Sequence, residues 1–454
     1  YTVRLGNFTL PVSLSYHASG IKVDEVASTV GLGWSLHAGG AITRQICGAP
    51  DLNNASNKYR DLNNFRQLVN DVHESNNGIE ILNSLIGGNP DLQDDAQPYD
   101  TETDRYTYSF CGKSGVFRQS LHTEEYIPLS HSRMPIRSIG KKQNSSFEIV
   151  DTDGVAYQFG RQEATGAKNE EGNAQVTAWY LTQVNTPNGN IHIHYVGSEP
   201  FSLFRSTDVL ATGLFGFALE EGGMDEHVSS RYSSWTSEFL YKTPVVSCIE
   251  WNGNKVVFSY ANDREDVWKT RLTGIDVVNL EGDTIQHVSL LNDSYWGNKS
   301  INKRMMLHGL QLADGGQYAF TYNEQGENLP DYPVFKKDYS TAMGINPCSS
   351  DYWGYYNGRS DKCYIPKEAY STMKSKVGYI YPVPHFTLND FADRTPNYTA
   401  TQTGIIKSII YPTGGRTEFA FEGNNIGERL GGLRIKSISN YGFNNKLLDS
   451  RTYT

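Results

Sequence analysis

The chain has 454 residues, among them 43 glycines and 29 tyrosines, and its formal net charge at pH 7 is −10. This length exceeds one ordinary hydrophobic core, so we expect two or three sub-domains or one extended sheet structure. The negative charge argues against a nucleic-acid partner, since phosphate binding needs a basic face, and the sequence has no apolar stretch long enough for a transmembrane helix.

Residues 1–49 are predicted to form an N-terminal β segment. Apolar and polar residues alternate with period two from Phe8 to Tyr16, which is typical of a half-buried strand. A run from Gly31 to Leu36 follows, with Trp34 directly after Gly33. Because glycine lets other groups approach the backbone closely, we expect Trp34 to be a core anchor.

Residues 50–105 are different in pattern. Apolar residues fall at helical spacing and predict a small helical insertion. An acidic loop follows, with Asp91, Asp94, Asp95, Asp100 and Asp104. Several oxygen ligands would suit Ca²⁺, but the EF-hand spacing with its central glycine is absent. A solvated loop is the preferred interpretation.

Residues 106–323 are predicted to be a β-hairpin region, with an irregular excursion of mixed helix and loop at 198–240. One unit recurs here and again near the C-terminus. It consists of an apolar stretch, a turn with Asn-Gly, Asp-Gly or Gly-Gly, and a short strand that ends on an aromatic residue. Such turns take up positive φ readily, and their twist matches paired strands. The closing aromatic residues are Phe159, Tyr195, Tyr260, Tyr322 and Phe421.

Residues 324–400 form a long, loop-rich and aromatic segment. Its cluster of Tyr352, Trp353, Tyr355 and Tyr356 is a candidate ligand-contacting loop, because exposed aromatic loops mark binding sites. The alternative, which we favour, is that these rings pack the interior. Residues 401–454 are predicted to be a C-terminal β segment that continues into further strands, in a chain that is a piece of a longer protein.

Few residues suggest catalysis or metal binding. His192 and His194 share one strand face, yet the sequence supplies no third metal ligand nearby. No Gly-x-Ser-x-Gly elbow and no phosphate-binding glycine loop occurs. The five cysteines have no Cys-x-x-Cys spacing; buried free thiols are favoured, and a bridge between Cys348 and Cys363 stays open. We therefore expect no cofactor and no metal.

The block from Leu10 to Leu36, with Ile42-Thr43-Arg44 after it, resembles the opening of bacterial Rhs/YD-repeat proteins, including the N-terminal region related to Tc-toxin B components. Gly31, Gly33, Trp34 and Arg44 carry this resemblance. It extends to Asp351-Tyr352-Trp353-Gly354-Tyr355-Tyr356 and to Gly431-Gly432. Dense tandem YD repeats are absent, as is the C-terminal self-cleaving motif. The piece would therefore lie upstream of the repeats, as the wall or the end-cap of the shell.

The resemblance implies a secreted or cell-surface polymorphic toxin, in which a β-sheet spirals into a hollow shell around a toxin fragment. The fold expected is mostly β: an extended antiparallel hairpin sheet forming part of a curved Rhs-type shell, with small helical insertions. The function expected is structural and non-enzymatic, with the rest of the same polypeptide as partner. A surface adhesin or carbohydrate-binding module is the alternative, and a glycan-active enzyme is a third possibility.

Overall fold

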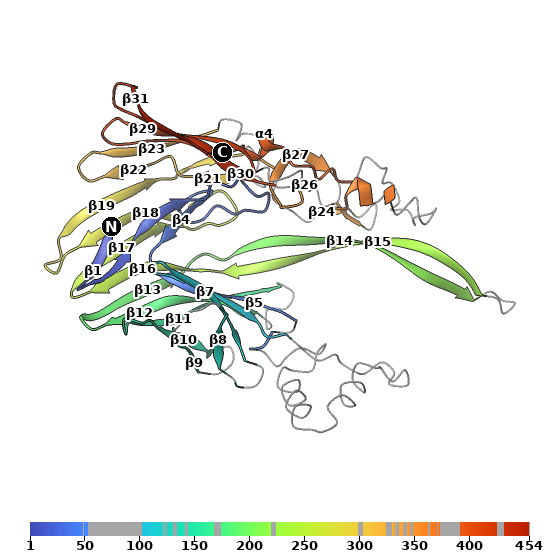
Figure 1. Ribbon diagram of the computed structural model, residues 1–454, viewed down its shortest axis with the longest axis horizontal. Helices are drawn as coiled ribbons and strands as arrows, with labels where there is room; N and C mark the ends of the chain where they lie inside the picture. Colours follow the sequence, from blue (N-terminus) through green and yellow to red (C-terminus); the bar gives the residue numbers. More distant parts are fainter. Residues whose placement is uncertain are drawn as a thin grey trace.

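The computed structural model describes residues 1–48, 50–52, 102–120, 123, 125–129, 134–140, 144–167, 174–218, 224–297, 303–323, 329–330, 332, 336–338, 343–345, 348–361, 364–369, 371–372, 391–424 and 431–453. Side chains are described for all of these except 167, 204–237, 336–338, 343–345 and 348. Nearly all of the described structure is β (Figure 1). The predicted fold class, an antiparallel hairpin sheet that curves, is confirmed.

The strands up to the first long hairpin are β1 (Thr2–Leu5), β2 (Phe8–Pro11), β3 (Ser13–Tyr16), β4 (Trp34–His37), β5 (Gly40–Gln45), β6 (Arg105–Phe110), β7 (Lys113–Gln119), β8 (Tyr126–Pro128), β9 (Ile136–Ile139), β10 (Ser146–Val150), β11 (Ala156–Ala167), β12 (Gln175–Thr186), β13 (Gly189–Gly197), β14 (Phe201–Ala218) and β15 (Met224–Lys242). The later strands are β16 (Pro244–Trp251), β17 (Asn254–Ala261), β18 (Arg271–Val278), β19 (Thr284–Leu291), β20 (Ser294–Trp296), β21 (Arg304–Met306), β22 (Gly309–Leu312), β23 (Gln317–Tyr322), β24 (Lys336–Asp338), β25 (Met343–Ile345), β26 (Cys348–Ser350), β27 (Tyr356–Asp361), β28 (Ile406–Ile410), β29 (Arg416–Gly423), β30 (Leu433–Tyr441) and β31 (Leu447–Thr452). The helix α4 spans Tyr398–Thr401.

Eight consecutive strands, β5 to β12, close into a ring. Each strand pairs antiparallel with the next, and β12 pairs back with β5 through Ala178 to Tyr180. Aromatic side chains fill this ring: Tyr106 stacks on Phe117 with ring centroids 5.0 Å apart, and Phe147 meets Trp179 edge-on at 5.0 Å. Side chains can fill a ring of about eight strands. The ring was not predicted from the sequence.

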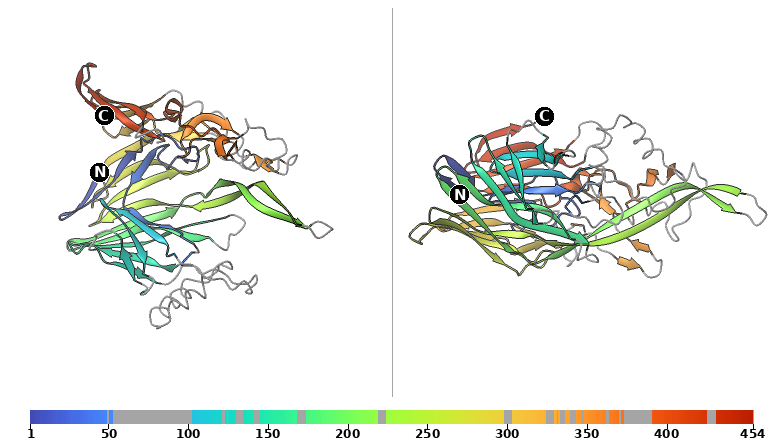
Figure 2. Two further views of the ribbon diagram at one scale, coloured as in Figure 1. Left: turned by 45° about the vertical axis from the view of Figure 1, so that its right-hand side comes forward. Right: turned by 90° about the horizontal axis from the view of Figure 1, so that it is seen from below.

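An open sheet starts from the same ring. The far end of β12 pairs with β13, and the sheet then continues through β16, β17, β18, β19, β22, β23, β28, β29 and β30 to β31. The long strand β12 therefore belongs to both bodies, since one of its edges is divided between β5 and β13. Figures 1 and 2 show the open sheet curving away from the ring.

Every closing aromatic of the sequence repeat lies at a register shift in the sheet. At each one the neighbouring strand carries one extra residue, as in a β-bulge. The extra residue directly follows the paired partner of the aromatic in each case; for Phe159, Tyr195, Tyr260, Tyr322 and Phe421 it is, in that order, Thr182, Ser247, Thr273, Lys407 and Lys436. Bulges bend a strand and increase its local twist. The repeat thus places a bulge where the second strand of each unit pairs with the next strand of the sheet, and that next strand carries the extra residue.

Polar side chains satisfy the backbone at these bulges. Thr182 donates to the carbonyl of Gln158 at 3.1 Å, and Thr273 donates to that of Ser259 at 3.0 Å. The Tyr260 hydroxyl donates to the carbonyl of Val246 at 2.8 Å. A bulge disrupts the ladder, so backbone groups there need other partners.

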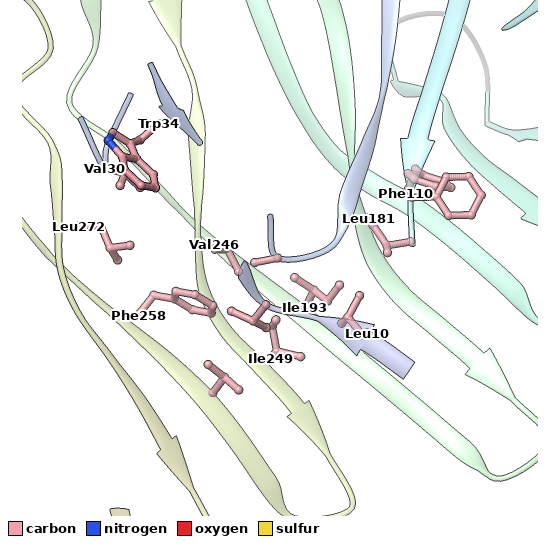
Figure 3. Close-up of a cluster of buried hydrophobic side chains, with 14 of the residues drawn as sticks. Leu10, Val30, Trp34, Phe110, Leu181, Ile193, Val246, Ile249, Phe258 and Leu272 are labelled. Carbon is pink, nitrogen blue, oxygen red and sulfur yellow. The ribbon is translucent and has the colours of Figure 1, made fainter. Parts of the chain in front are cut away.

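The N-terminal strands lie on the inner side of the curved sheet, between β16–β23 and the ring (Figures 1 and 2). The pairs β1–β2 and β3–β4 form two small sheets. Their side chains, including Leu10 and Trp34, join one buried cluster with Ile193, Ile249 and Leu272 of the open sheet (Figure 3). The N-terminal strands of the chain therefore supply part of the hydrophobic core of the open sheet.

One predicted segment is corrected. Residues 198–240 were predicted as mixed helix and loop, but Phe201–Ala218 and Met224–Lys242 form the paired strands β14 and β15, in register from Phe201↔Tyr241 to Ala218↔Met224. The hairpin projects far from the body (Figure 1). The large residues Val228, Arg231, Tyr232 and Trp235 recur at helical spacing, and glycines interrupt the apolar run before them, so the sequence pattern does not indicate these strands. The helical insertion predicted at 50–105 falls largely outside the described residues.

The turn prediction holds in part. Asn252 and Gly253 both have positive φ, at 45° and 78°, as a type I′ turn requires. At the Asn188-Gly189 and Asp153-Gly154 turns, only the glycine does. No helix within the described ranges has the length and apolar character to cross a membrane.

Candidate functional site: a junction of three distant motifs

The aromatic loop after β26 is a tight turn organised by one carboxylate. Asp351 Oδ1 accepts hydrogen bonds from the backbone N–H groups of Trp353 at 2.9 Å and Tyr355 at 3.0 Å. The backbone N–H of Asp351 donates to the Tyr355 carbonyl at 2.9 Å. Asp351 is fully buried, and burial raises its pKa although these hydrogen bonds oppose the shift.

The N-terminal block packs against this loop. Val23 donates its backbone N–H to the Gly354 carbonyl at 3.1 Å, and Tyr356 donates to the Ile21 carbonyl at 3.3 Å. The Tyr355 hydroxyl donates to Ser19 Oγ at 3.1 Å. Ser19 and Tyr355 are 336 residues apart in the sequence. Two distant segments of the chain thus form one hydrogen-bonded unit.

The glycine pair before β30 completes the junction. Leu433 donates its N–H to the Ser19 carbonyl at 2.7 Å. Gly432 has φ of +84°, and a Cβ there would lie 2.9 Å from Tyr355 Cε2. A Cβ on Gly431 would lie 2.4 Å from Trp353 Cε3. Only glycine fits at these positions, so the three motifs that carry the family resemblance meet at one place.

The candidate ligand-contacting loop divides into two pairs. Tyr352 and Trp353 are 54% and 38% exposed, and their rings meet edge-on with centroids 6.3 Å apart. Tyr355 and Tyr356 are half-buried and belong to the junction itself. The exposed pair can stack against a ligand, whereas the other pair serves packing.

One residue of this site was missed in the sequence. The Arg394 guanidinium lies 5.2 Å from the Tyr352 ring centroid and 5.7 Å from that of Tyr364, and it donates to the Asp351 carbonyl at 2.6 Å. A cation over an aromatic face fixes the orientation of the ring. Arg394 is an isolated arginine in a loop, so no sequence pattern connects it with Tyr352.

The remaining predicted motif residues lie in the core. Trp34 is 6% exposed and donates through Nε1 to the Tyr322 hydroxyl at 2.8 Å. A Cβ on Gly31 would lie 2.8 Å from the Leu307 nitrogen, and one on Gly33 would lie 2.7 Å from Tyr16 Cε2. Both glycines therefore allow the close backbone approach that the sequence suggested.

Arg44 forms a buried ion pair beside the ring. Its Nε lies 2.6 Å from Asp104 Oδ2, with both side chains fully buried, and its Nη1 donates to the Val176 carbonyl at 3.0 Å. Asp104 was grouped with the solvated acidic loop, and this is wrong for Asp104. The other four aspartates of that loop lie outside the described residues.

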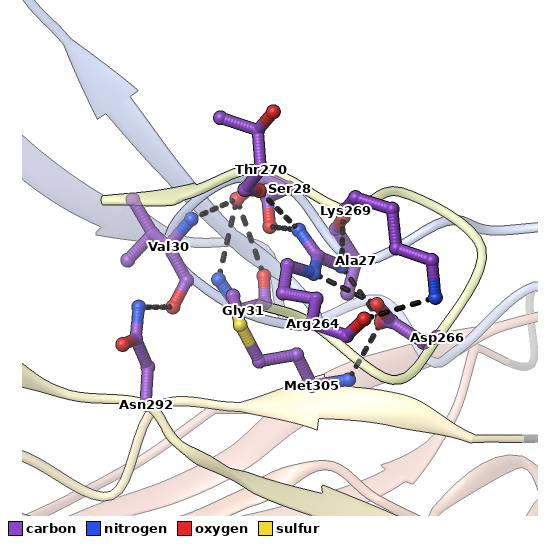
Figure 4. A network of polar contacts seen from close by, with 10 residues as sticks. All are labelled: Ala27, Ser28, Val30, Gly31, Arg264, Asp266, Lys269, Thr270, Asn292 and Met305. Carbon is purple, nitrogen blue, oxygen red and sulfur yellow. Dashed lines mark hydrogen bonds and ion pairs between the residues drawn. The ribbon is translucent and has the colours of Figure 1, made fainter. Parts of the chain in front are cut away.

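A second buried ion pair holds the N-terminal block from the other side (Figure 4). Arg264 and Asp266 form a bidentate pair with two N–O distances of 2.7 Å, and both side chains are fully buried. Arg264 also donates to the carbonyls of Ala27 at 3.0 Å and Ser28 at 2.8 Å. Asp266 accepts from the Met305 backbone N–H at 3.0 Å. The pair thereby clamps the segment that leads into Gly31.

The described residues contain no group of three or more His, Cys, Asp or Glu side chains placed to hold a metal ion. His194 lies 3.3 Å from Glu250 on an exposed face, while Ile191 and Ile193 are buried, as the strand alternation predicted. Cys47, Cys111 and Cys248 are free thiols. Cys363 and the side chain of Cys348 lie outside the described part, so their bridge stays a prediction.

Comparisons with known proteins add limited information. No protein-family model matches the chain, and no curated protein matches it. The N-terminal domain of the effector protein SpvB from Salmonella typhimurium strain LT2 aligns with a TM-score of 0.32 and 12% identity, over 68% of this chain and 96% of that one. TcdB2-TccC3 without its hypervariable C-terminal region aligns with a TM-score of 0.32 and 11% identity, over 69% of this chain and 15% of that one. The Photorhabdus luminescens Tc holotoxin pore aligns at 0.30 and 10%, over 71% of this chain and 16% of that one. At these TM-scores the alignments do not bear on what this chain does.

Proposed function

We propose that this chain is a structural, non-enzymatic wall of a secreted or surface-exported shell, and that it encloses a downstream toxin or effector segment of the same polypeptide. The form of the open sheet carries the proposal. From β11 to β31 antiparallel strands are added one after another, and at the closing aromatic of each repeat copy the next strand of the sheet carries one extra residue. Repeated bends of one kind make a sheet wrap around a space.

The last strand supports continuation of this wall. Among the described strands β31 pairs with β30 alone, and all six of its residues are exposed. Leu447 and Leu448 are 50% and 66% exposed, and Phe443 in the turn before them is 81% exposed. An edge strand with one unpaired side invites pairing with another strand. Downstream strands of the same polypeptide are the partner that the proposal requires.

A site-specific protease tests enclosure in the full-length gene product. One variant carries the protease site within the downstream segment. A second carries it at Glu281-Gly282-Asp283, the exposed tip of the β18–β19 hairpin. We expect rapid cleavage at the tip, and no cleavage of the downstream site until urea unfolds the wall. Equal cleavage of both sites in the native protein would overturn the proposal.

A surface adhesin or carbohydrate-binding module is the second candidate function. It is favoured by one observation, the exposed Tyr352–Trp353 pair held by Arg394. Aromatic faces of this kind stack on sugar rings or peptides. A glycan array tests this candidate. Binding that is lost in Trp353→Ala and kept in Phe443→Ala, a change of another exposed ring, would support it. Absence of binding by the unmodified protein would remove it.

A further inference from the structure

A cavity of about 570 Å³ lies between the ring and the first strands of the open sheet. Its walls come from β12, β13, β16 and β17, and the β3–β4 hairpin covers it. The turn of Phe110, Cys111 and Gly112 and the glycines before β5 complete the lining. The volume falls within the range of roughly 300–1,000 Å³ that is typical of small-molecule sites.

The lining is aromatic, and its one histidine, His37, is an exposed residue whose Nε2 lies 2.6 Å from Ser15 Oγ. Tyr180, Tyr195, Tyr260, Trp268 and Phe110 contribute rings. None of the described residues that line the cavity is Lys, Arg, Asp or Glu, although such residues make up 20% of the chain. An ion that entered would lose its hydration without gaining a charged partner, which is costly. The lining therefore selects against charged ligands.

Hydrogen bonds inside the lining fix how its rings are presented. The hydroxyls of Tyr195 and Tyr260 each donate at 2.8 Å to backbone carbonyls, of Leu181 and Val246. The Tyr180 hydroxyl donates to Glu163 Oε2 at 2.7 Å. These rings are thus held in place, and their faces and edges are what a ligand meets.

Serine hydroxyls provide polar contacts near the opening. Ser13, Ser35 and Ser109 all line the cavity, and all three are exposed residues. Hydroxyl groups can both donate and accept hydrogen bonds. They suit a ligand whose ring enters the cavity while its hydroxyl or carbonyl group stays at the mouth.

The backbone of the lining is shaped to keep this space open. Gly39 has φ of +137°, and a Cβ there would lie 3.2 Å from Ile193 Cδ1 and 3.6 Å from the Tyr195 hydroxyl oxygen. Cys111 and Gly112 have φ of 46° and 74°. Burial raises the pKa of the Cys111 thiol to about 12, so this thiol is neutral at physiological pH.

We propose that this cavity is a binding site for an uncharged small molecule with a flat apolar ring face and a hydroxyl or carbonyl group at its edge. The rings of Tyr195, Tyr260 and Trp268 would contact the ligand face, and the serines would contact its edge. The site is independent of the proposed enclosure, because it lies within the described chain and needs no downstream segment.

Two fluorescent probes that differ by one charge test the proposal. N-phenyl-1-naphthylamine is neutral, and 8-anilinonaphthalene-1-sulfonate is the same ring system with a sulfonate. Titration of the purified chain should show one site for the neutral probe and binding of the anionic probe at least about tenfold weaker, a difference of about 1.4 kcal/mol. Equal affinity of the two probes, or no binding of the neutral one, would overturn the proposal.

Matched variants locate the bound probe. Ser35 and Ser15 are directly paired on β4 and β3 and share one face of the hairpin, but only Ser35 lines the cavity. Ser35→Trp should abolish binding of the neutral probe, and Ser15→Trp should preserve it. Ser109→Trp fills the cavity from the ring side and should give the same loss if Ser35→Trp fails to fold. Unchanged binding in a folded Ser35→Trp or Ser109→Trp variant would show that the probe sits elsewhere and would contradict the assignment.

Discussion

The hydroxyl of Tyr195 donates a 2.8 Å hydrogen bond to the carbonyl of Leu181, the residue that directly faces the preceding closing aromatic, Phe159. Tyr260 repeats this relation, since its hydroxyl donates to Val246, which faces Tyr195. In the next hairpin the Asn292 side chain donates to Leu272, which faces Tyr260. A side chain from the following hairpin thus fastens each of these three bulges. Tyr195 and Tyr260 therefore have two roles, because each lies at one bulge and secures the bulge before it.

Tyr195→Phe tests this fastening. The ring stays while one neutral hydrogen bond is lost, so we expect the free energy of unfolding to fall by about 0.5–1.5 kcal/mol. Urea denaturation measures it, and Tyr453→Phe, on an exposed residue near the end of the chain, is the control. A loss no larger than that of the control would show that the hydroxyl contributes nothing.

Breaking the buried clamp should cost more. Arg264→Met leaves Asp266 buried without its partner, and Asp266→Asn does the same to Arg264, so each should lower the free energy of unfolding by about 3–5 kcal/mol. The double variant Arg264→Met with Asp266→Asn should cost less than the sum of the two single changes. Arg359→Met, in a pair where Arg359 is 48% exposed, should cost at most about 1 kcal/mol. Equal losses for Arg264→Met and Arg359→Met would contradict the role given to the clamp.

A pair of glycine substitutions separates crowding from backbone strain at the junction. Gly432 and Gly282 have φ of +84° and +94°, but a Cβ meets Tyr355 at 2.9 Å in the first and nothing within 4 Å in the second. Gly282→Ala should cost about 1–2 kcal/mol of stability for its left-handed backbone. Gly432→Ala should cost about 1–3 kcal/mol more because of overpacking. Thermal denaturation of both variants gives the comparison, and similar losses would mean that the junction tolerates a side chain.

The stability of the chain should depend on the protonation of His308. Burial lowers the pKa of this imidazole, and Asp293 offsets the shift in part. Below about pH 6.5, the ordinary pKa of histidine, the unfolded chain therefore binds the proton more readily than the folded one. The stabilisation that the neutral His308 imidazole contributes is fully present above that pH, and it is lost as the pH drops through the folded-state pKa of this group. His308→Gln should lose less stability than the unmodified protein between pH 7 and pH 5, whereas His37→Gln, on an exposed residue, should follow the unmodified protein. Parallel curves for His308→Gln and the unmodified protein would contradict this.

The sequence predicted what is local. Three features are encoded within a few neighbouring residues. They are the Asn252-Gly253 turn, the period-two alternation around Ile191 and Ile193, and the glycines beside Trp34. They were enough for the hairpins, the strand faces and the position of one core anchor.

What the sequence did not predict depends on long-range contacts. Closure of the ring requires β12 to pair with both β5 and β13, and nothing in the sequence of Gln175–Thr186 shows that one edge is divided. The same holds for the junction, where Ser19 accepts from the Tyr355 hydroxyl through its side chain and from the Leu433 N–H through its carbonyl. Arg394 and the Arg264–Asp266 pair stand beside other charged residues in loops, and only the fold reveals that these side chains are buried or stacked.

Electron cryo-microscopy of the full-length gene product tests the central claim most directly. The account predicts that β31 gains a further antiparallel strand on its free edge, and that the continued sheet closes around density for a downstream segment. A map in which β31 stays unpaired, with the downstream region folded as a separate body outside the curved sheet, would contradict it.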